Sequence, residues 1–181
     1  MPKAVRTLTS LLLSLVCVGL VAGSNAAPAQ AVLTGEWTAS TKTDKPDEIY
    51  VSFERRTEGG GRNQMGTNYA YSDLQGLSRE RAMSGGPVKF SLAREAGTVE
   101  CEGSFQNGRG SGTFRFTGNP SFVSAMKARG FDFEKAIHHG QSFEEKLFAA
   151  ATLNVTTALA DDLLSAEFGA LEVQDLFMAP I

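Results

Sequence analysis

The chain has 181 residues, 42% of them hydrophobic, and a formal net charge of −3, which is typical of one globular core or two small ones. This acidic balance argues against nucleic acid as a partner, because nucleic-acid binding needs clustered Lys and Arg. It argues equally against electrostatic attachment to anionic lipid.

The first 31 residues show the order of features typical of a secretory signal peptide. Lys3 and Arg6 give a positive start, residues 11–21 are almost purely apolar, and a small-residue stretch ends in Ala29-Gln30-Ala31. The apolar run is too short to span a bilayer in a folded protein. We therefore predict cleavage after Ala31, with Ala26 as the alternative. The mature chain would be periplasmic or secreted, with no membrane span and a net charge of −5.

The two cysteines lie on either side of this predicted cleavage site. Cys17 belongs to the apolar run, and Val16 before it does not fit a lipoprotein signal, which favours a small residue there. Cys101 would then be alone in the mature chain, so no internal disulfide is possible. Its neighbours Glu100 and Glu102 favour a small buried hydrophobe over a reactive thiol, which needs a nearby cation.

Residues 32–118 are predicted to form an antiparallel β-sheet domain, as a meander or half-barrel. Apolar residues alternate with polar ones in four segments, at Ile49 to Phe53, Val88 to Leu92, Val99 to Phe105 and Phe114 to Phe116. Because side chains alternate along a strand, each apolar set lies on one face of the sheet and the other face is exposed to solvent. Asn107-Gly108 between two of these segments predicts a tight hairpin.

Residues 119–181 are predicted to form an α-helical repeat region, which makes the fold class α+β. Asn119, Ser142 and Thr156 stand where helix N-caps are expected, and Ser142 also begins a capping-box pattern. Leu147-Phe148-Ala149-Ala150 recurs as Leu176-Phe177-Met178-Ala179, which favours short helical units stacked in sequence. Whether such an array is complete where the chain ends, at Ile181, is left open.

Three stretches of the predicted sheet resemble a known family. They are Val88 to Thr98, Glu102 to Phe105 and Gly108 to Phe114. They resemble a bacterial extracytoplasmic module that often follows membrane-bound metallopeptidases of the beta-lactam-sensor type and also occurs in exported proteins without the peptidase. Leu74 to Leu77 fits the same pattern.

The resemblance extends loosely into the helical region, to cover roughly residues 33–168. Leu147-Phe148, then Asn154-Val155-Thr156 and Leu163, are similar to the helical repeat that follows the sheet in that family. Glu167-Phe168 departs from it, since the family's repeat closes with Gly and an aromatic residue. The resemblance implies a fold and an extracytoplasmic location, and no defined activity comes with it.

Familiar catalytic and metal-binding patterns are missing from the sequence. There is no His-Glu-x-x-His and no Gly-x-Ser-x-Gly. The two histidines, His138 and His139, are adjacent, so they would point about 100° apart on a helix and chelate one metal poorly. Three acidic residues near them in sequence could supply further metal ligands, namely Asp132, Glu134 and Glu144. We predict no catalytic residue, no metal site and no cofactor.

Three functions remain as hypotheses. The leading one is an exported, non-catalytic interaction module of the bacterial cell envelope, which binds another protein or a second copy through its helical region. The alternative is a small-molecule binder with an apolar pocket inside the curved sheet. That pocket would be lined by Trp37, Phe53, Phe90 and Phe114. The third is an extracytoplasmic hydrolase.

Overall fold

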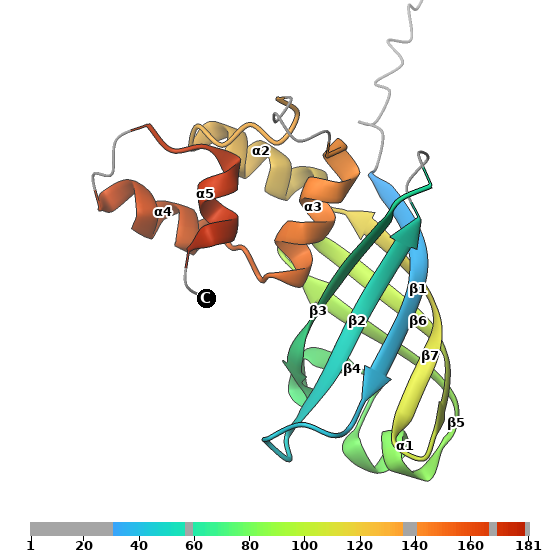
Figure 1. Cartoon of the computed structure of the whole chain (residues 1–181). Coiled ribbons are helices and arrows are strands. Elements are labelled where there is room, and N and C mark those ends of the chain that lie inside the picture. The colour runs from blue at the N-terminus through green and yellow to red at the C-terminus, as the bar shows by residue number, and fades with distance from the viewer. Residues whose placement is uncertain (1–30, 57–59, 136–140, 167–169, 180–181) are drawn as a thin grey trace, which may run out of the picture.

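A computed structural model gives the fold of this chain and describes residues 31–56, 60–135, 141–166 and 170–179. Of the predicted signal peptide only Ala31 is described. His138, His139, Glu167-Phe168 and Ile181 also lie outside the described residues. The described chain is α+β, with a curled sheet and a group of helices at one end of it (Figure 1).

Seven antiparallel strands form one sheet in the order β3-β2-β1-β7-β6-β5-β4. The strands are β1 (Val32–Ser40), β2 (Glu48–Arg56), β3 (Arg62–Ala70), β4 (Leu74–Gln75), β5 (Gly86–Arg94), β6 (Gly97–Gln106) and β7 (Arg109–Gly118). Short connections join each strand to its neighbour within β1–β3 and within β4–β7, and the β1–β7 pair unites the two halves. The predicted antiparallel half-barrel is therefore confirmed.

The inner face of the curled sheet carries the apolar residues of the alternating pattern. Val88, Phe90 and Leu92 of β5 are buried, while Lys89 between them is exposed. The same alternation puts the apolar residues of β2, β6 and β7 on the inner face. This core also holds Trp37, whose Nε1 donates a hydrogen bond to the Glu102 carbonyl at 3.2 Å.

Two glycines face each other where β6 and β7 pair beside Trp37. Gly103 of β6 faces Gly112 of β7, and a Cβ at Gly103 would lie 2.8 Å from Cζ2 of Trp37. Gly103 therefore makes room for the indole ring, and a Cβ at Gly112 would collide with the backbone of Glu102 and Gly103. In the predicted hairpin Asn107 and Gly108 have φ of 52° and 72°, the left-handed pair that a two-residue turn requires.

A helix lies at each end of the half-barrel (Figure 1). The short helix α1 (Arg79–Ser84) contacts β6 at one end. At the other end α3 (Phe143–Thr152) packs on β1, β6 and β7, and its Phe148 meets the rings of Phe53, Phe114 and Phe116. The core is thus closed by a helix that follows the sheet in sequence.

The remaining helices are α2 (Pro120–Ala128), α4 (Thr157–Ser165) and α5 (Val173–Met178). All three predicted N-caps are confirmed: Asn119, Ser142 and Thr156 accept backbone hydrogen bonds, and Ser142 forms a full capping box with Glu145. The last strand ends at Gly118 and α2 begins at Pro120, so the change from strands to helices falls at the predicted place. One buried apolar cluster nevertheless runs through both parts.

The predicted helical repeat is not confirmed. Leu147 and Leu176 are both buried, as equivalent positions would be, but their neighbours differ. Phe148 is buried against the sheet, whereas Phe177 is half-buried beside Phe133, with ring centroids 6.4 Å apart. The two helices also differ in length, with ten residues in α3 and six in α5.

Candidate binding surfaces

The four aromatic residues predicted to line an apolar pocket lie on the inner face and pack on one another. Trp37 meets Phe90 edge-on at 5.1 Å, and Phe53 meets Phe114 edge-on at 5.2 Å. All four side chains are buried. The space beside Phe53 and Phe114 is about 20 Å³, far below the roughly 300 Å³ of the smallest usual ligand pockets. In this structure the rings fill the interior, and the apolar ligand pocket stays a prediction.

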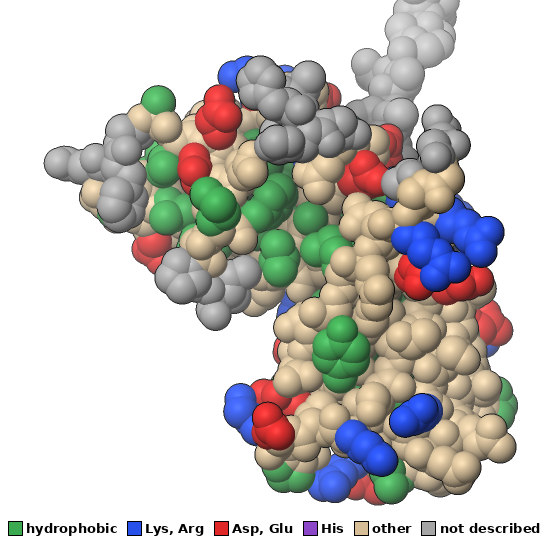
Figure 2. Space-filling view, viewed as in Figure 1, with side chains coloured by type: hydrophobic (Ala, Val, Ile, Leu, Met, Phe, Trp, Pro, Cys, Tyr) green, Lys and Arg blue, Asp and Glu red, His purple; other side chains and the backbone are tan. Residues whose placement is uncertain are grey.

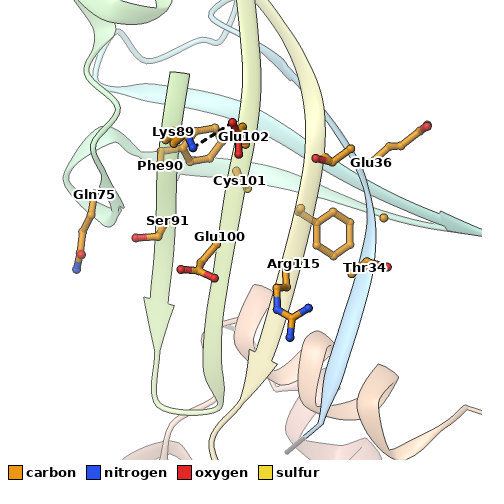
Figure 3. A pocket seen from close by; sticks show the side chains of 13 residues that line it. Thr34, Glu36, Gln75, Lys89, Phe90, Ser91, Glu100, Cys101, Glu102 and Arg115 are labelled. Carbon is orange, nitrogen blue, oxygen red and sulfur yellow. Dashed lines mark ion pairs between the residues drawn. The ribbon is translucent and has the colours of Figure 1, made fainter. Parts of the chain in front are cut away.

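A hollow of about 830 Å³ lies on the outer face of the sheet (Figure 3), and we call it the outer hollow. Each of four neighbouring strands gives it three consecutive residues, and β4 adds Gln75. Because side chains alternate across a strand, the middle residues Phe90, Cys101 and Phe114 point into the core and offer the hollow their backbone. The outward side chains on either side of them are Thr34, Glu36, Lys89, Ser91, Glu100, Glu102, Thr113 and Arg115.

Charges of both signs line this outer hollow. Lys89 pairs with Glu102 at 3.1 Å, and Figure 3 shows both at one side of the hollow. Arg115 stands opposite Glu100 across the β6–β7 pair, but within the described chain no ion pair joins them. The outer hollow therefore suits a polar ligand with both charges. Because both members of the Lys89–Glu102 pair are exposed, each such contact contributes little free energy.

Cys101 is the one cysteine among the described residues, and its side chain is buried. Burial raises the pKa of the Cys101 thiol to about 12, so the thiol stays protonated at neutral pH. Among the residues described, no group of three or more His, Cys, Asp and Glu could hold a metal ion. Two of the acids considered near the histidines, Asp132 and Glu134, instead lie 3.8 Å and 2.8 Å from the Lys127 ammonium.

A second candidate surface lies on the helices. Leu164 of α4 is 43% exposed and Met178 of α5 is 70% exposed, which is unusual for large apolar side chains. Half-buried apolar residues accompany them on the same two helices and just before α5. We call this set the helical apolar surface: Leu159, Leu163, Leu164, Leu171, Phe177 and Met178. Figure 2 shows apolar side chains gathered over α4 and α5.

The two helices that carry the helical apolar surface are anchored to the rest of the protein. Ala160 of α4 and Val173 and Leu176 of α5 are buried in the common core. Arg129, after α2, donates two hydrogen bonds to the Asp161 carboxylate of α4, at 2.8 and 3.0 Å. The exposed leucine and methionine are therefore presented from anchored helices.

The sequence analysis did not identify the residues that form the outer hollow or the helical apolar surface. Leu164 is exposed, and no local sequence pattern sets it apart from the less exposed Leu163 beside it. The outer hollow depends on the register of four strands, which no local pattern encodes. No helix in the described chain is long and apolar enough to cross a membrane alone, although α3 and α4, bent by 89°, pass that test as a pair.

Comparison with protein families, with curated proteins and with solved structures found no match for this chain.

Proposed function

We propose that this chain is an exported, non-catalytic interaction module of the bacterial cell envelope or its medium, and that it binds another protein through the helical apolar surface. The observation that carries the proposal is the exposure of Leu164 and Met178 beside four half-buried apolar residues. Burying such side chains in a partner yields about 25 cal/mol per Å² of apolar area.

The surroundings of this surface have the make-up of an interface rim. Asp162 and Glu172 are exposed on the same helices, so an apolar centre is bordered by acidic groups. Specific interfaces commonly combine an apolar centre with a polar rim. The partner that fits best presents apolar side chains surrounded by Lys or Arg. The recurring Leu-Phe segments of α3 and α5 support the further proposal that the helices are repeat units, on which a partner packs.

A non-catalytic role is supported by the chemistry of the described residues. The single described cysteine is buried and protonated. The resemblance of residues 88–114 to an extracytoplasmic module without defined activity supports the same role. An extracytoplasmic hydrolase remains the weaker proposal, because nothing in the described chain pairs a nucleophile with a base.

Site-specific photo-crosslinking tests this proposal. A photoreactive amino acid at position 164 should give a discrete cross-linked product in the exporting cell, and the same group at the exposed Gln106 on the sheet should give none. The partner is then purified and its binding measured directly. Leu164→Ser combined with Met178→Ser should abolish that binding and leave the melting temperature unchanged. Equal cross-linking at both positions, or unchanged binding by the double variant, would refute the proposal. A product of twice the chain mass would identify a second copy as the partner.

The outer hollow favours a second function, the binding of a small polar ligand. Its volume of about 830 Å³ is in the range of small-molecule sites, which is about 300–1,000 Å³. It lies on the polar outside of the sheet, whereas the sequence favoured the apolar inside. A ligand found by screening should lose affinity in Arg115→Ala and keep it in Arg79→Ala, which alters an exposed arginine outside the hollow.

A further inference from the structure

Tyr50 of β2 is an exposed aromatic residue that lies against the outer face of the sheet. Its side chain is 39% exposed. A Cβ built on Gly66 of β3 would fall 2.2 Å from the Tyr50 hydroxyl oxygen and 2.8 Å from Cζ. The phenol therefore occupies the space that a side chain at position 66 would fill. One side of the ring covers the backbone of Gly66, and the other side is free to meet a ligand.

Uncharged polar residues surround this ring. Ser40 and Asn68 stand opposite Tyr50 on the two neighbouring strands. The next row of outward residues across the sheet is Gly66, Ser52, Thr38, Ser111 and Ser104. We call these eight residues the Tyr50 platform. Figure 2 shows one apolar side chain within a broad uncharged area over β2 and β3.

Two glutamates of β2 near the platform are already paired. Glu48 pairs with Lys45 at 2.7 Å, and Glu54 pairs with Arg62 at 3.3 Å. The eight platform residues themselves carry no charge, and the exposed Arg109 of β7 borders them opposite Ser40. A neutral ligand therefore fits the platform itself better than a charged one.

The platform has spare hydrogen-bonding capacity. Ser52 is buried under Gln64, whose Nε2 donates to its Oγ at 2.9 Å. The side chains of Thr38, Ser104 and Ser111 are exposed, and within the described chain no side-chain hydrogen bond occupies them. A hydroxyl group both donates and accepts, which matches another hydroxyl group. The row from Ser52 to Ser104 crosses four strands, or about 14 Å.

We propose that the Tyr50 platform is a binding surface for a neutral polysaccharide. A sugar ring combines a face of C–H groups with a rim of hydroxyl groups, and it would place the C–H face on the free side of Tyr50. The hydroxyl rim would then meet Thr38, Ser111 and Ser104. The row from Ser52 to Ser104 is longer than one sugar ring, so the platform suits a chain of sugars. This surface is separate from the helical apolar surface and does not depend on it.

Affinity electrophoresis of the full mature protein tests this proposal. Native gels would contain a soluble β-1,3-glucan, a β-1,4-glucan or a mannan, with anionic alginate as the charged comparison. We expect retardation by at least one neutral polymer and none by alginate. Tyr50→Phe keeps the ring and should keep binding, whereas Tyr50→Leu should weaken it about two- to tenfold, the range expected for loss of one aromatic contact. Met83→Ala, which removes an exposed apolar side chain from α1, should bind as the parent does.

A second measurement covers the case in which Tyr50→Leu does not fold, since the ring also covers Gly66. Amide NMR shifts of the unaltered protein are followed as the retarding polymer is added. They should change first at Thr38, Tyr50 and Asn68. The proposal is overturned if no neutral polymer retards the protein, or if folded Tyr50→Leu is retarded as strongly as the parent. Shifts that cluster away from the platform, or equal retardation by alginate, would also overturn it.

Discussion

The ring of Phe148 on α3 lies parallel to the ring of Phe114 on β7, with centroids 5.1 Å apart and planes inclined by 8°. Phe148 also meets Phe53 and Phe116 edge-on, at 5.6 and 5.4 Å. One helical side chain therefore completes an aromatic cluster formed by residues of β2 and β7. The sheet and the helices share this core, so we expect them to unfold together.

Phe148→Ala should destabilise the mature protein by about 3–5 kcal/mol, the usual cost of truncating a buried Phe. Phe114→Ala should cost a similar amount for the same reason. The double variant should lose less than the sum of the two, by about 0.5–1.5 kcal/mol, because the two rings share one contact. Urea denaturation followed by far-UV circular dichroism and by Trp37 fluorescence measures these differences.

The matched control for these variants is Leu164→Ala, which truncates an exposed side chain on α4 and should change stability by less than about 0.5 kcal/mol. Coincident transitions by both probes are expected. If helical signal were lost in Phe148→Ala at a urea concentration that leaves the sheet intact, the shared core would not be one cooperative unit.

The signals in the sequence that predicted structure correctly are local ones. The Asn107-Gly108 turn and the three N-caps depend on residues within four positions of each other, so each could be recognised without the fold. The alternating strands were recognised because one of their faces is almost entirely apolar.

The elements that escaped prediction lack such a signal. The inward positions of β3 include Asn63, Met65 and Thr67, so the strand shows no clear apolar alternation and is specified by its pairing with β2. The helix α1 has six residues and one buried side chain, Ala82, so it is too short to show a helical period in the sequence.

The candidate surfaces depend on contacts between residues distant in sequence. Tyr50 and Gly66 are adjacent only because β2 and β3 pair in one register, and a shift by one residue would turn the ring to the other face. Leu164 shares the helical spacing of its buried neighbours, and only the packing of α4 decides which leucines are covered. The helical spacing in the sequence therefore identifies the apolar residues but does not show which of them remain exposed.

Cys101 should resist thiol reagents in the folded protein. Because burial raises the pKa of its thiol to about 12, the thiolate is scarce below pH 10. Reaction with a colorimetric disulfide reagent at pH 8 should be slow and should become complete in denaturant. Rapid stoichiometric reaction of the native protein would contradict the burial of this side chain.

The same shift makes folding stability depend on pH. The folded state holds the Cys101 proton up to about pH 12, while the unfolded chain releases it near pH 9. The contribution is therefore fully present below pH 9 and is lost as pH rises from 9 towards 12. Cys101→Ala should be destabilised at pH 7, yet its stability should fall less steeply over this alkaline range. Equal slopes for parent and variant in urea titrations at pH 8, 9 and 10 would count against this linkage.

His138 and His139 lie outside the described residues, so the expectation that they bind no metal stays a prediction from sequence. Replacing both with Ala should leave the melting temperature and the zinc content unchanged. Elemental analysis of the purified protein checks this, before and after a chelator is added. Stoichiometric zinc in the parent that disappears in the double variant would show a metal site that the sequence did not reveal.

Ala31 contributes to the fold, although cleavage after this residue was the first choice from sequence. Its side chain is 6% exposed, and its carbonyl oxygen accepts a hydrogen bond of 2.7 Å from the backbone N–H of buried Gly118. Cleavage after Ala31 would remove this acceptor and place a charged amino group on Val32. A buried donor left unsatisfied costs about 1–3 kcal/mol.

We therefore expect a chain that begins at Ala27 to be more stable than one that begins at Val32, by about 1–3 kcal/mol. Urea denaturation of the two purified chains measures the difference. A third chain that begins at Ala31 is the control and should match the first, because it keeps the Ala31 carbonyl. N-terminal sequencing of the exported protein should then find Ala27, the product of the alternative site after Ala26. A mature N-terminus at Val32 with undiminished stability would show that the Ala31–Gly118 hydrogen bond is dispensable.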